Sequence, residues 1–151
     1  MRHQKPVRQI LMALMALFFF FPWNFFLRAA HADVSIICHP AVAADTLSRA
    51  EIKKIFLGKK LVWDDEQEIR FVIMKKSDAH KVFVKAYTQK TPSQFTHYWK
   101  KLVFTGKGSA PKSFHTEAEL IQYVSETAGA IGYVPSELRP ENVKILKISD
   151  K

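Results

Sequence analysis

Cysteine is almost absent from this sequence, in which Cys38 is the single one among 151 residues. One cysteine cannot form a disulfide within the chain, so a domain of this size must rely on its hydrophobic core. Cys38 lies in an apolar run rich in β-branched residues, where a thiol packs as a small hydrophobic side chain. The histidines lack the H-x-x-x-H and H-E-x-x-H spacings, and one thiol adds no ligand cluster. We therefore expect no metal and no cofactor.

Several other patterns are missing. There is no cluster of arginines and no alternation of aromatic and basic residues, so we do not expect a nucleic-acid partner. The segment Thr105–Ser109, TGKGS, lacks the G-x-x-x-x-G-K-[ST] spacing and is interpreted as a basic turn. No catalytic arrangement emerges, and we do not expect an enzyme. A hydrolase that uses Ser77 and His80 as nucleophile and base is an alternative, but no oxyanion-stabilising group accompanies them.

The beginning of the chain has the composition of an export signal. Residues 1–9 carry three basic side chains and no acidic one, residues 10–21 form an unbroken apolar run, and Ala30 and Ala32 flank His31. This order predicts a secretory signal peptide at residues 1–32, cleaved near Ala32, and a periplasmic domain at residues 33–151. The alternative is an uncleaved membrane anchor, because residues 10–27 are nearly long enough to span a bilayer, although Pro22 and Asn24 interrupt them.

Part of the positive charge belongs to this first segment. The formal charge falls from +9 to +5 without residues 1–32, because they contain four basic residues and no acidic one. A mild positive balance is typical of a protein with an anionic ligand, or serves solubility alone.

Strand and helix patterns alternate along the rest of the chain. Short apolar runs predict strands at residues 34–38, 69–74, 130–134 and 143–148. Helices are predicted after Ser48, from Asp78 to about Gln89, and after Thr91 and Thr116. All four starts have cap signals, namely the capping boxes Ser48/Glu51 and Thr116/Glu119, the pair Thr91-Pro92, and Ser77 before Asp78. The alternation predicts an α/β fold with a mainly parallel sheet flanked by helices.

Two segments resemble motifs of the phosphate-binding proteins of bacterial ABC transporters. Residues 47–63, LSRAEIKKIFLGKKLVW, are similar to LSRxxLxxIFLGxxxxW. Residues 127–134, TAGAIGYV, are similar to TPGAIGYV, with Ala128 in place of the proline. The motifs occur in the family's order, and the resemblance covers most of the chain after residue 33. It implies a type II periplasmic-binding-protein-like fold and, since that family has two lobes and more than twice this length, a single-lobe version of it.

The candidate site is the segment Lys75-Lys76-Ser77-Asp78, where a strand ends and a helix begins. Free N–H groups and a partial positive charge at helix N-termini bind anions. In the resembled family this place reads RSDGSGT, and its arginine, serines and threonine help to hold phosphate. Here Ser77-Asp78 match, Lys76 stands at the arginine position, and Ala79-His80 replace the next glycine and serine. We expect phosphate or a related oxyanion at Lys76, Ser77, Asp78 and His80; the alternative is an ordinary capped helix with solvated lysines.

These expectations lead to two functions. The resemblance implies an exported solute-binding-like protein for phosphate or a related oxyanion, linked to an ABC transporter permease. The alternative is a periplasmic interaction or regulatory module that keeps this fold without tight ligand binding, with another periplasmic protein as its partner. The alternative is motivated by the expected absence of the first lobe and by the replaced G-S-G-T. Lysine at the arginine position also lacks the bidentate fork of arginine.

Overall fold

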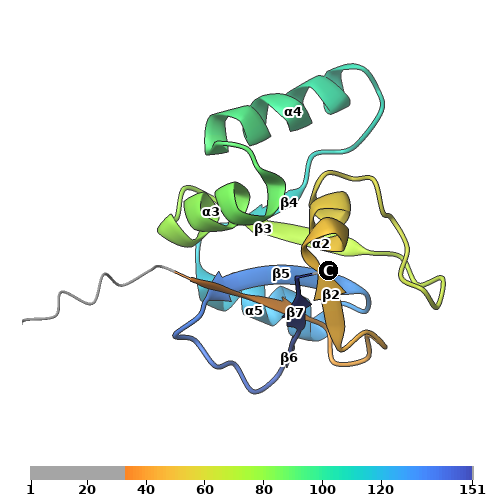
Figure 1. Cartoon of the computed structure of the whole chain (residues 1–151), viewed down its shortest axis with the longest axis vertical. Helices are drawn as coiled ribbons and strands as arrows, with labels where there is room; N and C mark the ends of the chain where they lie inside the picture. The colour runs from red at the N-terminus through yellow and green to blue at the C-terminus, as the bar shows by residue number, and fades with distance from the viewer. Residues whose placement is uncertain (1–32, 151) are drawn as a thin grey trace, which may run out of the picture. The chain divides into compact units, whose positions relative to one another are not determined.

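The computed structural model describes residues 33–150, so the expected signal peptide lies outside the described residues. The elements in chain order are β1 (Val34–Cys38), β2 (Thr46–Ser48), α2 (Arg49–Phe56), β3 (Arg70–Met74), α3 (Asp78–Phe83), a π-helical segment (Val84–Thr88), α4 (Pro92–Phe104), β4 (Lys112–Phe114), α5 (Glu117–Glu126), β5 (Ala130–Pro135), β6 (Lys144–Ile145) and β7 (Lys147–Ser149) (Figure 1). Within residues 33–150, no helix is both long enough and apolar enough to cross a membrane.

The strands form one sheet of five and one of two. The larger sheet has the order β4-β3-β5-β1-β6, and β2 pairs with β7 in the smaller one. Parallel pairs predominate in the described residues: β3 with β4, β3 with β5, and β2 with β7 are parallel, whereas β1 pairs antiparallel with β5 and β6. The α/β fold with a mainly parallel sheet flanked by helices is confirmed, with the antiparallel pairs gathered around β1.

Helices cover both faces of β5, the buried central strand of the five-stranded sheet. On one face, the Tyr133 ring stacks on Phe83 with 3.8 Å between centroids and lies 5.9 Å from Phe56. On the other face, Gly132 lies against Leu120 and Val124 of α5. A side chain added to Gly132 would meet Leu120 at 2.9 Å, so this glycine lets α5 pack close to the sheet. The core therefore has two layers, with α2 and α3 on one side of the sheet and α5 on the other.

The predicted helix starts are confirmed, and two element predictions need correction. The capping boxes Ser48/Glu51 and Thr116/Glu119 both form, and Thr91 caps α4 with proline in its first turn. The helix predicted from Asp78 to Gln89 is α-helical only to Phe83 and then π-helical, and a positive φ of 58° at Gln89 ends it. The strand predicted at residues 143–148 is split at Leu146, because β6 pairs with β1 and β7 pairs with β2.

Candidate functional site

The four predicted site residues lie in the turn between β3 and α3 and in the first turn of α3. β3 ends at Met74, and Lys76 turns the chain with a positive φ of 49°. Ser77 then caps α3, because its hydroxyl oxygen accepts the backbone N–H of His80 at 3.0 Å. This cap satisfies one of the free donors of the first turn and leaves the others without an intrahelical partner. The predicted strand end and serine cap are both present.

The four residues differ in where their side chains lie. Lys76 is exposed, and Ser77 is half-buried with its hydroxyl engaged in the cap. Asp78 is exposed and pairs with Lys81, with 2.8 Å between carboxylate and ammonium. This hydrogen bond lowers the pKa of the Asp78 carboxyl. His80 is 8% exposed and points into the protein. The structure therefore exposes Lys76, buries His80 and assigns Asp78 to a surface ion pair.

His80 belongs to a buried hydrogen-bond chain with Tyr133. The Tyr133 hydroxyl accepts the backbone N–H of Met74 at 3.1 Å and lies 2.6 Å from Nδ1 of His80. Because its oxygen already accepts from Met74, the hydroxyl can donate its own proton to Nδ1. Burial lowers the pKa of His80, which favours the neutral ring. With the hydroxyl donating to Nδ1, the neutral ring carries its proton on Nε2, which is then a hydrogen-bond donor.

A basic hollow lies beside this turn, between β3, α3 and α4. Its volume is about 720 Å³. The polar and charged residues that line it are Lys75, Lys76, His80, Lys81, Ser93, Thr96, His97, Lys100 and Ser113. Four of these are lysines, and no acidic residue of the described chain lines the hollow. Its wall therefore combines positive charge with hydroxyl donors, which is the chemistry that binds oxyanions.

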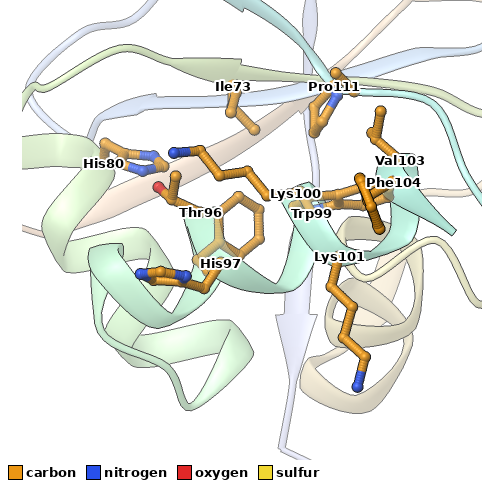
Figure 2. A pocket seen from close by; sticks show the side chains of 12 residues that line it. Ile73, His80, Thr96, His97, Trp99, Lys100, Lys101, Val103, Phe104 and Pro111 are labelled. Carbon is orange, nitrogen blue, oxygen red and sulfur yellow. The ribbon is translucent and has the colours of Figure 1, made fainter.

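An apolar hollow of about 770 Å³ adjoins it on the sheet-facing side of α4 (Figure 2). The apolar residues that line it are Ile73, Phe95, Trp99, Val103, Phe104, Ala110 and Pro111. Figure 2 shows the amino group of Lys100 directed toward the His80 ring, whereas Lys101 points away from it. Lys100 and His80 thus lie where the two hollows meet.

α4 contributes residues that the sequence analysis did not assign to the site. Thr96, His97 and Lys100 recur along one side of this helix and line both hollows. α4 is held against α2 by its aromatic residues: the Trp99 indole donates to the Phe56 carbonyl at 3.2 Å, and the Tyr98 hydroxyl donates to the Leu57 carbonyl at 2.7 Å. The only sequence signal for this wall is the i, i+3, i+4, i+7 spacing of the polar residues Ser93, Thr96, His97 and Lys100, opposite the apolar face of the helix.

The remaining chemistry-bearing groups are placed as follows. Within residues 33–150, no group of three or more histidine, cysteine, aspartate or glutamate side chains could hold a metal ion. Cys38 is fully buried, as its apolar context predicts, and burial raises the pKa of its thiol to about 11. A buried neutral thiol is a poor nucleophile. The Ser77 hydroxyl contacts the backbone of His80, whose Nδ1 is engaged by Tyr133, so this geometry does not supply the serine with an imidazole base.

The fold recurs in solved structures of phosphate receptors. An ABC-type phosphate transport receptor from Vibrio cholerae matches 76% of this chain with a TM-score of 0.58 and 14% sequence identity. A protein from Clostridium perfringens, described as a phosphate ABC transporter substrate-binding protein with bound phosphate, matches 76% with a TM-score of 0.60 and 15% identity. PstS from Borrelia burgdorferi matches 78% with a TM-score of 0.55 and 16% identity.

These matches cover only part of the solved proteins. The chain spans 45%, 44% and 48% of their respective lengths, a little under half of each. No family model matches the sequence, and no curated protein matches it. At these identities the likeness concerns the fold. This chain therefore has the fold of a part of the phosphate ABC transporter substrate-binding proteins, as its two sequence motifs predict.

Proposed function

We propose that this protein binds phosphate or a related oxyanion in the basic hollow. The observation that carries the proposal is the lining itself, in which four lysines and three hydroxyl side chains face a solvent-accessible hollow without an acidic residue among them. Charged hydrogen-bond donors gathered in one concave site raise the local concentration of anions and bind them. The solved proteins of the same fold support the ligand class, because they are described as a phosphate transport receptor and as a substrate-binding protein with bound phosphate.

The residues have distinct roles in this proposal. Lys76 and Lys100 approach the anion from the β3–α3 turn and from α4, and supply charge. His80 supplies a neutral Nε2–H donor, oriented by its contact with Tyr133. Ser77 positions the turn through its cap, and Asp78 partly balances Lys81. The anion is then held by flexible ammonium groups, which contact it as point charges without the bidentate geometry of arginine.

Calorimetric titration of the purified protein with phosphate and with sulfate tests this proposal. We expect saturable binding, and we expect Lys76→Gln and Lys100→Gln each to weaken it by roughly tenfold, because a hydrogen bond to a charged group contributes about 1.5–3 kcal/mol. Lys54→Gln is the matched control, since Lys54 is exposed on α2 and does not line the hollow. Absence of binding heat for both anions at millimolar concentration would contradict the proposal.

We further propose that the protein is an exported solute-binding protein, with residues 33–151 as the mature domain and an ABC transporter permease as its partner. The N-terminal sequence pattern supports export, and the description of a solved protein of this fold as an ABC-type phosphate transport receptor supports the partner class. Cell fractionation followed by mass spectrometry tests the export. The expected product is a periplasmic chain that starts at Asp33. A full-length chain in the membrane fraction would contradict cleavage and indicate that the N-terminal segment serves as a membrane anchor.

The interaction module is the second candidate, and one observation favours it. Phe104, at the end of α4, is 93% exposed, and the neighbouring Val103 is 44% exposed. Exposed apolar side chains that lie together mark interaction sites more often than isolated ones. A pull-down from a periplasmic extract with the wild type and with Phe104→Ser distinguishes this candidate. Recovery of one specific partner by the wild type alone supports it, and equal recovery by both variants excludes a role for this surface.

A further inference from the structure

The basic hollow and the apolar hollow adjoin each other, and together they are called the trough. They meet at five shared lining residues, namely Ile73, His80, Thr96, His97 and Lys100. α4 provides one wall along the whole length, since its N-terminal half lines the basic hollow and its C-terminal half lines the apolar hollow. A ligand that enters the basic hollow therefore contacts apolar surface as soon as it extends past Lys100.

The two ends of the trough have opposite chemistry. At one end, Lys75, Lys76 and Lys81 supply positive charge. At the other end, Trp99, Phe104 and Pro111 present apolar surface, and Phe104 is 93% exposed. The charged neighbour at this end, Lys101, points away from His80 and the basic end in Figure 2. An inorganic anion contacts only the lysine end of the trough. A ligand whose apolar group covers the other end gains binding free energy in proportion to the apolar area that it removes from water.

We propose that the trough binds, as a free molecule, a phosphomonoester that carries an apolar chain or ring. The phosphate group lies among the lysines, and the apolar group lies along α4 against Trp99 and Phe104. This inference rests on the proposed function, because it uses the same anion site and names the substrate class for it. The volume of the apolar hollow, about 770 Å³, is in the range of small-molecule sites, which are roughly 300–1,000 Å³.

Titration of the purified protein with hexyl phosphate and with inorganic phosphate tests the inference. We expect hexyl phosphate to bind at least about tenfold more tightly, because each buried methylene strengthens binding severalfold. Phe104→Ser should reduce this ratio severalfold. Leu61→Ser is the matched control. Leu61 is, like Phe104, a large apolar side chain exposed to solvent (62%), but it lines neither hollow. The control should keep the wild-type ratio.

The other arms of the experiment separate the possible failures. Equal affinities for the two phosphates would overturn this inference and leave the proposed function intact. Absence of binding for both would overturn the inference together with the proposed function. Binding of hexanol as tight as that of hexyl phosphate would show that the lysines take no part, and would also overturn it. A further outcome is that the protein sediments with vesicles that contain phosphatidic acid but does not bind hexyl phosphate. This would overturn the inference of a free ligand and indicate that the trough binds a membrane surface.

Discussion

His80 is the one predicted site residue whose surroundings are set by a residue far away in the sequence. Its position three residues after a cap serine is visible in the sequence, whereas its contact with Tyr133, 53 residues further on, depends on how β5 packs against α3. Sequence patterns report neighbours along an element, and they do not report which buried ring will meet which hydroxyl. The serine cap of α3 was therefore predictable, and the neutral, oriented imidazole was not.

The stability of the protein should decrease with acid through His80. Burial lowers the pKa of His80 below its ordinary 6.5, so the unfolded chain binds a proton that the folded chain excludes. The free energy of unfolding therefore falls as the pH drops below about 6.5 toward the folded pKa. Urea denaturation between about pH 7.5 and pH 5.5 measures this slope. His80→Gln should flatten it, whereas His115→Gln, at an exposed position, should keep it; an unchanged slope in His80→Gln would contradict the assignment.

Gly129 should be far less tolerant of a side chain than Gly106. Both have positive φ, 75° and 67°, at which an L side chain costs about 1–2 kcal/mol. At Gly129 a Cβ would also lie 2.1 Å from the Glu68 carbonyl oxygen, whereas at Gly106 nothing lies within 4 Å. We expect Gly106→Ala to reduce the free energy of unfolding by about 1 kcal/mol, and Gly129→Ala by at least about 3 kcal/mol, because the backbone must move. Equal losses in chemical denaturation would show that the chain relaxes at Gly129 without cost.

At the scale of elements, the sequence predicted well what short-range signals determine. The starts of α2, α4 and α5 follow from cap residues within four positions, and all three caps form. The strands β2 and β4 have three residues each, and they exist because distant strands, β7 and β3, pair with them. The split at Leu146 has the same origin, since its backbone N–H donates to the Ile36 carbonyl at 2.9 Å while the chain passes between two sheets. Pairing partners of this kind carry no local signal.

The attachment of α4 to α2 should depend on Trp99. The indole is 7% exposed, donates to Phe56, and lies so close to Gly58 that a Cβ there would meet it at 2.8 Å. Trp99→Ala should reduce the free energy of unfolding by about 3–5 kcal/mol. It should also abolish phosphate binding, since α4 carries Lys100, and hydrogen exchange should rise first in α4. His97→Ala, at an exposed position on the same helix, is the control for stability. If Trp99→Ala retains its affinity for phosphate, α4 takes no part in the anion site.

At the scale of the whole molecule, the site predicted from sequence is one side of a larger arrangement. The motif residues Lys76 and His80 come from the β3–α3 connection, and α4 and β4 supply the opposite wall through Lys100 and Ser113. These walls meet because β3 pairs with β4 and Trp99 anchors α4 to α2. The fold itself was predictable, since two motifs and the alternation of elements indicated it. The trough was not, because it arises from the packing of elements about 20 to 40 residues apart.

The exposure of the lysines leads to a last prediction, the salt dependence of anion binding. Lys75, Lys76, Lys81 and Lys100 are all exposed, so their attraction for an anion acts partly through water and is screened by salt. Affinity for phosphate should fall severalfold between about 0.01 M and about 0.15 M sodium chloride, over which the screening length shortens from about 30 Å to about 8 Å. Calorimetry at several salt concentrations measures this, and Lys100→Gln should show a shallower dependence. A constant affinity would mean that neutral donors, such as the His80 Nε2–H and the first turn of α3, hold the anion and that the lysines serve solubility.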